Sequence, residues 1–206
     1  LSGTVLGPLL NDPAALSALG DAVHQPPYKA PPKAPVLYVK PRNTLAESGA
    51  LVERGEWELG AALAMVIGRT ACRVSEAQAL SHVAGYTLVA DLSVPHDSFY
   101  RPSVRFKARD RSCLIGPQVV PASAVPDPAA VVLKVSVDGQ VVHESRCSVM
   151  QRGAARLLQD VSEFMTLHPG DLLLLGVAFG APRVKAGQRF AVETAAIGRL
   201  EGRVAA

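Results

Sequence analysis

The stretch that decides the fold runs from residue 56 to residue 93 and reads EWELGAALAMVIG (56–68), RTACRVSEAQALSHVA (69–84) and GYTLVADLS (85–93). Its first and last segments are rich in apolar and β-branched residues between glycines, a pattern typical of buried strands. In the middle segment apolar residues recur at helical spacing after Ser75, which is a suitable N-cap. We therefore expect a strand, a short helix and a second strand.

Composition places this stretch in a globular chain. The 206 residues are 49% apolar and 19% charged, which is enough to bury a core as one large domain or one with a small appendage. The net charge of +3 is not concentrated in a basic run, and only 5% of residues are aromatic. Neither a nucleic-acid surface nor a base-stacking platform is expected.

The cysteines and the apolar runs indicate in which cellular compartment the protein is expected. Cys72, Cys113 and Cys147 are far apart, without CxxC or zinc-ligand spacing, so we expect reduced and mostly buried thiols. Residues 1–10 lack the basic start and long apolar core of a signal peptide, and no apolar run approaches the roughly 20 residues of a membrane helix. A cytoplasmic location without membrane association is the expectation.

The chain before residue 36 is expected to form a separate small piece. Residues 3–10 favour a strand and residues 12–23 a short amphipathic helix, while five prolines in residues 25–35 predict an extended connector. We therefore divide the chain into residues 1–35 and a main domain of residues 36–206. The main domain opens with a strand at 36–40, whose end carries Lys40 and Arg42, either functional or merely solvated.

The rest of the main domain is rich in strand signals. Residues 97–110 are polar, aromatic and irregular, as expected of an active-site loop or lid. A helix is expected at 154–165, and Asp138-Gly139 is a two-residue hairpin turn. The expected strands are 118–120, 131–137, 141–145, 172–177, 188–194 and 196–204. Many strands and few helices indicate a β-rich α+β fold with antiparallel or mixed pairing.

Local motifs go further than composition. In order, the chain carries KP (40–41), AMVIG (64–68), GY followed by Asp91, FKARD (106–110), IGP (115–117), the DG hairpin and HPGD (168–171). This series resembles the fumarylacetoacetate hydrolase family. The resemblance implies a mixed β-sheet roll with a few short helices, carbon–carbon bond chemistry on a dicarboxylate or tricarboxylate, and a Mg²⁺ or Mn²⁺ ion. Such an ion would stabilise the enolate that this chemistry requires.

Two further segments are similar to one branch of that family. VPHDSFYRP (94–102) precedes FKARD, and YKAPPKAPVLYVKPRNT occupies residues 28–44. Both resemble the branch that breaks down 4-hydroxyphenylacetate. What this implies is decarboxylation of 5-oxopent-3-ene-1,2,5-tricarboxylate and isomerisation of 2-hydroxyhepta-2,4-diene-1,7-dioate.

The chain departs from the family at the metal site. The family binds its metal with two glutamates, one residue apart, and an aspartate. Here Gly60 and Ala62 stand at the glutamate positions, and Asp91 alone is retained. Glu56 and Glu58 form a similar pair four residues upstream, about 13 Å along a strand at ~3.3 Å per residue. We expect an exposed acidic strand start there and a degenerate metal site without bound metal.

Other residues remain candidates for binding and catalysis. The resemblance assigns catalytic roles to Lys107 and Asp91, although Lys107 could instead only fix its loop by pairing with Asp91 or Asp110. His96 is a general-base candidate or a solvated loop residue. A hydroxyl that the family places against substrate is Leu175 or Val177 here. The expected substrate-binding residues are Arg101, Tyr100 and Arg105, with Arg109 as a further anion-binding candidate.

Two functions from different classes follow. The chain is either a component of the isomerase/decarboxylase, as a subunit or as the first half of a duplicated protein, or a non-catalytic structural paralogue. A third possibility is a small-anion-binding module built on Lys107. In each case we expect a homo-oligomer, or a hetero-oligomer with an intact paralogous subunit.

Overall fold

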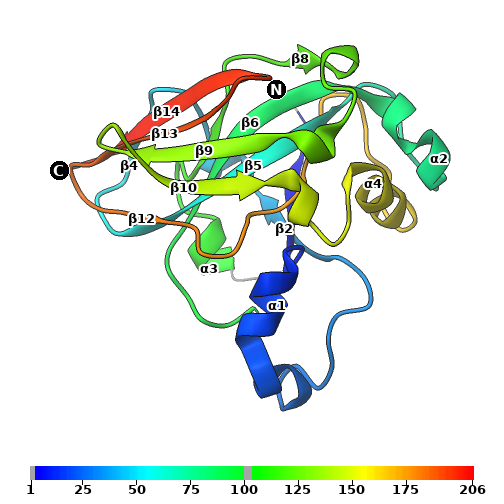
Figure 1. Ribbon diagram of the computed structural model, residues 1–206, viewed down its shortest axis with the longest axis horizontal. Coiled ribbons are helices and arrows are strands. Elements are labelled where there is room, and N and C mark those ends of the chain that lie inside the picture. The colour runs from blue at the N-terminus through cyan, green and yellow to red at the C-terminus, as the bar shows by residue number, and fades with distance from the viewer. Residues whose placement is uncertain (1–2, 100–103) are drawn as a thin grey trace.

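The structure, a computed structural model, describes residues 3–99 and 104–206 as two β-sheets with short helices at their edges (Figure 1). In these residues the larger sheet has nine strands: β1 (Val5–Leu9), β2 (Val36–Lys40), β3 (Leu45–Glu47), β5 (Trp57–Ile67), β6 (Val83–Ser93), β7 (Cys113–Ile115), β8 (Val120–Pro121), β11 (Leu172–Leu174) and β12 (Arg183–Val184). The second sheet contains β4 (Leu51–Val52), β9 (Val132–Val137), β10 (Gln140–Arg146), β13 (Arg189–Thr194) and β14 (Gly198–Val204).

The helices are short. The α-helices are α1 (Pro13–Leu19), α2 (Glu76–Ala79), α3 (Val104–Lys107) and α4 (Ala154–Ser162). Short 3₁₀ segments add η1 (Gly20–His24), η2 (Arg42–Thr44), η3 (Leu80–His82), η4 (Ala122–Ala124), η5 (Pro128–Ala130) and η6 (Cys147–Val149). Because β1–β11 and β3–β7 pair in parallel and most other pairs are antiparallel, the expected β-rich α+β fold with mixed pairing is confirmed.

Strands β5 and β6 form the long antiparallel ribbon at the centre of the larger sheet. Each has 11 residues, and Glu58 pairs with Ser93 and Gly60 with Asp91. The expected strand, helix and strand of residues 56–91 are confirmed, although the helix is the single turn α2 followed by η3. Residues 68–82 connect the two strands, which pair with each other as antiparallel neighbours.

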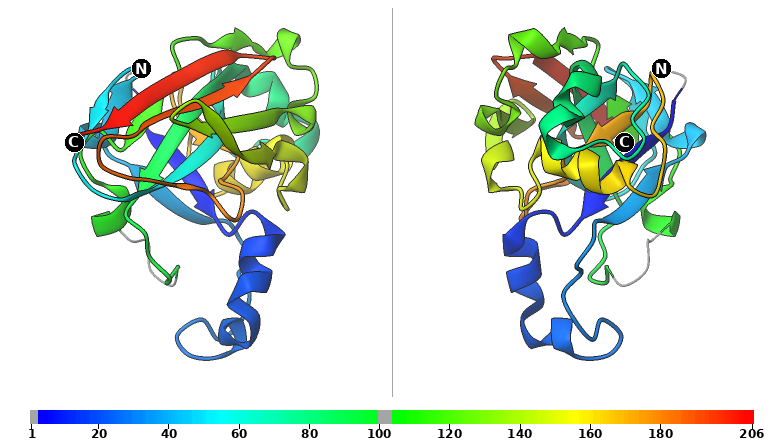
Figure 2. Two further views of the ribbon diagram at one scale, coloured as in Figure 1. Left: turned by 60° about the vertical axis from the view of Figure 1, so that its left-hand side comes forward. Right: turned by 90° about the vertical axis from the view of Figure 1, so that its right-hand side faces the viewer.

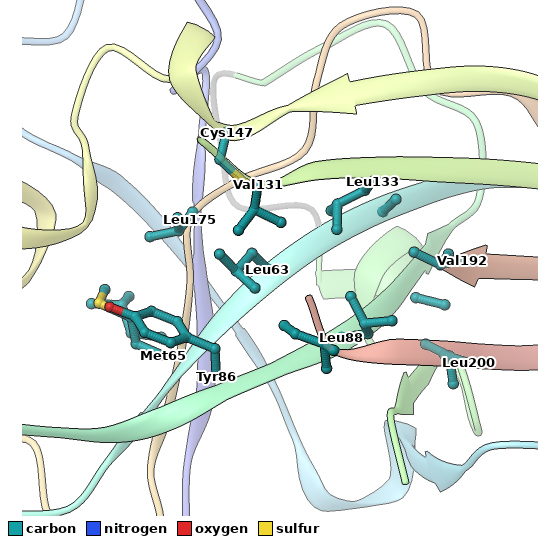
Figure 3. Close-up of a cluster of buried hydrophobic side chains, with 14 of the residues drawn as sticks. Leu63, Met65, Tyr86, Leu88, Val131, Leu133, Cys147, Leu175, Val192 and Leu200 are labelled. Atoms are coloured by element: carbon teal, nitrogen blue, oxygen red, sulfur yellow. The ribbon is translucent and has the colours of Figure 1, made fainter. Parts of the chain in front are cut away.

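One face of this ribbon packs against the second sheet. Leu63 and Leu88 from the ribbon face Leu133 and Val192 across the interface between the sheets (Figure 3). These side chains are fully buried or nearly so, and the cluster extends over both sheets. Burial of this apolar area is the main source of the stability of the fold.

The opposite face of the larger sheet carries a second, smaller cluster. Its buried members all come from strands of that one sheet: Val5, Ala62, Ala64, Val66, Val89, Cys113, Ile115, Leu172 and Leu174. Tyr38 and Lys40 of β2, at one end of the strand order, contact Asp91 of β6, so the sheet curls around this face. The expected roll is therefore confirmed, and its concave face bears the candidate site.

The N-terminal segment is split between the sheet and an arm. Strand β1 lies between β2 and β11 in the larger sheet, so the sheet extends across the boundary expected at residue 35. The physical reason is that the apolar residues of β1 are buried, and pairing on both edges satisfies their backbone groups. By contrast, α1 and the connector project away from the sheets in both views of Figure 2.

The remaining expectations hold in most places. Asp138 and Gly139 both have positive φ, as a type I′ hairpin turn between β9 and β10 requires. Strand β7 was not expected, because three residues are too few to show a period. Cys113 and Cys147 are buried and Cys72 is exposed, all as free thiols. None of the described helices is long and apolar enough to cross a membrane.

Candidate active site

The candidate site is built around Asp91, near the end of β6, on the concave face of the larger sheet. Its carboxylate is 1% exposed, and two ammonium groups flank it. Lys107 Nζ donates to Asp91 Oδ2 at 2.8 Å, and Lys40 Nζ lies 2.6 Å from Oδ1. This second contact is a fully buried ion pair. Tyr38 Oη also donates to Oδ2.

Lys40 is a buried cation with several backbone acceptors. Its Nζ donates to the carbonyl oxygens of Leu92 and Lys107, each at 2.8 Å, and reaches Ser112 at 3.3 Å. Since the carbonyl of Lys107 ends α3, Lys40 fixes the segment from which the Lys107 side chain extends. In these contacts Lys40 stabilises the fold. This differs from both expectations for Lys40, a functional residue or a solvated one.

The electrostatics follow from burial and from the two ammonium charges. Burial alone would raise the pKa of Asp91, but the nearby charges of Lys107 and Lys40 hold it well below its usual range. Burial lowers the pKa of Lys40, and the attraction of Asp91 opposes that shift. Burial, followed by the charge of Asp91, raises the pKa of Tyr38. With both lysines protonated and Asp91 ionised, the cluster has a net charge of +1.

Cys113 extends the cluster from β7, where it pairs with Asp91 across the sheet. Burial raises the pKa of this thiol to about 12. A thiol with so high a pKa stays protonated at neutral pH and is a poor nucleophile. Cys113 therefore acts here as a small packing residue.

A pocket of about 430 Å³ opens over this cluster. Lys107 and Arg183 are the lysine and arginine that line it, and Lys107 has a side chain 10% exposed and Nζ 4.4 Å from the centre of the Tyr38 ring. The walls come from α1, the 96–99 segment and residues 177–181. Asp97, Phe99 and Lys107 belong to the 97–110 segment expected to be an active-site loop, and His96 directly precedes it.

Three pocket residues were not expected from the sequence. Tyr38 and Lys40 are two residues apart in the strand VLYVK and therefore point to the same face of the sheet. This alternation could have predicted that Tyr38 lies beside Lys40. Ser93 follows Asp91 by two residues, lies on the same face and lines the pocket with Glu58. The acidic strand start is thus only partly exposed, because Glu58 is half-buried whereas Glu56 is exposed beside Arg183.

The other expected residues are distributed unevenly. His96 lines the pocket, with Nδ1 2.9 Å from the Val94 carbonyl oxygen and its ring stacked 4.9 Å from that of Phe106. Arg105 is exposed on α3 and is not among the described pocket residues, and Arg109 pairs with Glu53 at 2.8 Å. Tyr100 and Arg101 lie outside the described residues. Of the two hydroxyl-position candidates, Leu175 is in the main core and Val177 lines the pocket.

The residues at the expected metal position do not fit a divalent cation. Mg²⁺ and Mn²⁺ favour several oxygen ligands, but Gly60 and Ala62 supply no side-chain oxygen and the Asp91 carboxylate is paired with ammonium groups. A Cβ added at Gly60 would lie 2.6 Å from Val177 Cγ2, so Val177 fills the space where a ligand side chain would begin. Among the described residues, no three His, Cys, Asp or Glu side chains gather to hold a metal.

The chain is similar to known enzymes over nearly all of its length. It is 38% identical over 195 residues to the Escherichia coli 4-hydroxyphenylacetate degradation bifunctional isomerase/decarboxylase, covering 93% of this chain and 44% of that protein. It is 37% identical over 209 residues to the Salmonella dublin enzyme of the same name, covering 100% and 48%. The chain therefore spans about half the length of these curated relatives.

Solved structures share the fold over nearly the whole chain. Fumarylpyruvate hydrolase from Pseudomonas aeruginosa in complex with Mn²⁺ and pyruvate has a TM-score of 0.81 and 25% identity, covering 98% of this chain and 89% of that one. The 2-hydroxyhepta-2,4-diene-1,7-dioate isomerase from Mycobacterium marinum has a TM-score of 0.76 and 26% identity, covering 100% and 75%. Residues 4–205 match the family described as fumarylacetoacetate (FAA) hydrolase C-terminal, and the chain belongs to that family.

Proposed function

We propose that this chain is a component of the isomerase/decarboxylase of 4-hydroxyphenylacetate (homoprotocatechuate) catabolism. Its substrates would be 5-oxopent-3-ene-1,2,5-tricarboxylate and 2-hydroxyhepta-2,4-diene-1,7-dioate. The observation that carries this proposal is the 37–38% identity to the bifunctional enzymes over 93–100% of the chain. A cytoplasmic location belongs to the same proposal, since these are small-molecule catabolic steps.

Within that role, the pocket over Asp91 would bind a substrate carboxylate through Lys107. Its ammonium lines the pocket directly above Asp91, and the three-residue cluster of Lys107, Lys40 and Asp91 has an excess of one positive charge. An ammonium can bind a carboxylate without a bridging metal. Catalysis that depends on Mg²⁺ or Mn²⁺ would then occur in a partner subunit, or in a second half, that keeps both glutamates.

A second candidate is a non-catalytic paralogue that binds a small anion and supports an intact partner. Gly60 and Ala62 favour it, because they remove the ligands on which the family's metal chemistry depends. Under this alternative the pocket would still bind carboxylates, but no reaction would take place in it. Assays of the chain alone, and of the chain with such a partner, separate the two roles.

The binding test is calorimetric titration of the purified chain with oxalate and with pyruvate in the presence of EDTA. Lys107→Met should weaken binding at least tenfold, because it removes the ammonium next to Asp91, which would bind the carboxylate. Lys185→Met is the matched control, since Lys185 is exposed and away from the pocket, and should leave binding unchanged. Undetectable oxalate binding by the unsubstituted chain would refute the carboxylate site.

The metal test uses the same protein without EDTA. We expect Mg²⁺ and Mn²⁺ to bind no more tightly than about millimolar, because selective sites for these ions need several oxygen ligands. Decarboxylation of the tricarboxylate by the chain alone should stay at the background rate and rise when the partner is added. Micromolar metal binding would contradict the metal-free site, and Glu56→Gln and Glu58→Gln would then locate its ligands.

A further inference from the structure

Glu58 stands in the pocket without a partner for its carboxylate. It is the second residue of β5 and lines the same pocket as Lys107. Among the described residues, the Glu58 side chain forms no ion pair or hydrogen bond, whereas nearby Glu56 lies 3.7 Å from Arg183. A half-buried carboxylate left unpaired beside a cation is available to a ligand.

The strand register places two further polar groups beside Glu58. Arg183 of β12 and Ser93 of β6 are its direct neighbours on either side across the sheet, and both line the pocket. Residues that pair in this way have Cβ atoms about 4.5–5.5 Å apart. The three side chains therefore form one row across the pocket: a guanidinium at the rim, a carboxylate in the middle and a hydroxyl at the far side.

The Ser93 hydroxyl is an independent sign of a ligand. Ser93 is 1% exposed, and its Oγ has no hydrogen-bond partner among the described residues. A buried polar group without a partner is costly, so such groups are rare unless a ligand or water satisfies them. Its position between Glu58 and Asp91 on the pocket face points to a bound polar molecule.

We propose that Glu58 is the acid–base residue of a metal-independent proton transfer on a 2-oxo dicarboxylate. This inference rests on the proposed function, because Lys107 would hold the 2-oxo acid end of the substrate. Arg183 would bind the remote carboxylate, and Ser93 would donate to the carbonyl oxygen. The reacting carbon then lies over Glu58, between the two cations.

The reaction step is a simple keto–enol exchange. A Glu58 oxygen takes a proton from the carbon next to the carbonyl group, and the C–H electron pair forms the carbon–carbon double bond. The carbonyl π electrons move to oxygen, where the Lys107 ammonium and the Ser93 hydroxyl stabilise the enolate. Return of the proton from Glu58 to the same carbon, or to the far end of a conjugated enol, gives exchange or isomerisation. No oxidant or reductant is needed.

The other titratable groups of the pocket are less suitable. Both oxygens of Asp91 contact ammonium groups, and its pKa is well below the usual range, so it is a weak base. His96 and Asp97 are the rivals, since both also line the pocket, but stacking on Phe106 and the contact with Val94 fix the His96 ring, and Asp97 is exposed. A test must therefore distinguish Glu58 from His96 and Asp97.

The experiment follows deuterium incorporation at C3 of 2-oxoglutarate in D₂O by proton NMR, with EDTA present. The unsubstituted chain should exchange above the buffer rate, and Glu58→Gln should lower the enzymatic rate about 100-fold or more. Oxalate affinity of this variant should stay within threefold, which shows that the pocket is intact. Glu163→Gln is the control, since Glu163 is exposed and is not among the described pocket residues, and His96→Gln and Asp97→Asn test the rival bases.

Each outcome decides the inference. Full exchange by Glu58→Gln, or loss of exchange in His96→Gln or Asp97→Asn instead, overturns the role of Glu58. Oxalate binding without any exchange by the unsubstituted chain overturns proton transfer but leaves the anion-binding function standing. If oxalate does not bind, the proposed carboxylate site itself fails.

Discussion

The two faces of the β5–β6 ribbon share one backbone but carry different chemistry. Leu59, Leu63 and Met65 belong to the face that packs against the second sheet, and all three are apolar and fully buried. The opposite face has Gly60 and Ala62 on β5 and Asp91 on β6, next to the pocket. Because successive side chains along a strand point to opposite faces, adjacent residues belong alternately to the core and to the face that bears the pocket.

The difference in side-chain size between the two faces explains how the fold leaves space for a pocket on one of them. Large side chains on the core face fill the volume between two sheets, while small ones on the other face leave room above a buried charge cluster. That room is only partly open, since Val177 occupies the space next to Gly60. Substitutions on the two faces should therefore lower the free energy of unfolding by different amounts and for different physical reasons.

The largest effect is expected from Asp91→Asn, which leaves two buried ammonium groups without their anion. Removing one partner of a buried ion pair costs about 3–5 kcal/mol of unfolding free energy. Urea denaturation at pH 7 measures it, with Asp21→Asn as an exposed control of the same chemistry. Lys107→Met should cost less than Asp91→Asn, because it leaves a neutral pair of Asp91 and Lys40.

The same variant tests the pH dependence. The pKa of Asp91 is lower in the folded state than the unfolded value of about 3.9, so the unfolded chain binds the proton first on acidification. This contribution to stability is complete above about pH 4 and is lost as the pH falls toward the folded pKa. Asp91→Asn should lack this component of acid destabilisation, and an unchanged acid profile would contradict the assignment.

A smaller effect is expected from Leu63→Ala on the core face. Leu63 is 0% exposed, and truncating a buried leucine costs about 2–5 kcal/mol through lost burial and the cavity left behind. The adjacent Ala62→Gly is the control on the other face and should cost only about 0.5–1 kcal/mol. Equal losses in urea denaturation would show that the two faces do not differ in packing.

The smallest of these effects is expected from Gly60→Ala. Its Cβ would lie 2.6 Å from Val177 Cγ2 and 2.9 Å from the Asp91 carbonyl oxygen, so overpacking should cost about 1–3 kcal/mol. The double variant Gly60→Ala with Val177→Ala should recover part of this loss. A double-mutant cycle measures the coupling, and strict additivity would mean that Val177 does not restrict this position.

Much of the fold could be predicted because its signals are local. The apolar run and bounding glycines of residues 57–67, the Asp138-Gly139 turn and the apolar spacing of α4 each act within a few residues. The position of β1 between β2 and β11 could not be predicted in this way. It depends on pairing between Val5 and Leu172, which no local pattern specifies.

The site was predictable only where a motif carried it. Asp91 and Lys107 were expected from the family motifs, and the structure brings them within 2.8 Å of each other. Lys40 and Tyr38 join them because β2 packs near the end of β6, and that contact is again long-range. Glu58 was singled out in the sequence, but its place in the pocket, and that of Ser93, follow only from the register that puts them opposite each other.

The place of β1 has a consequence for how the chain reaches its native state. Strand β1 lies near the start of the chain, and one of its two edges pairs with β11, 167 residues later. That edge stays unpaired until β11 is in place. Such distant pairing raises the contact order and slows folding, and it exposes an open strand edge in the meantime. The part of the sheet that borders the pocket is thus completed late, so damage far along the chain, in residues 172–174, would leave the beginning of the protein prone to aggregation.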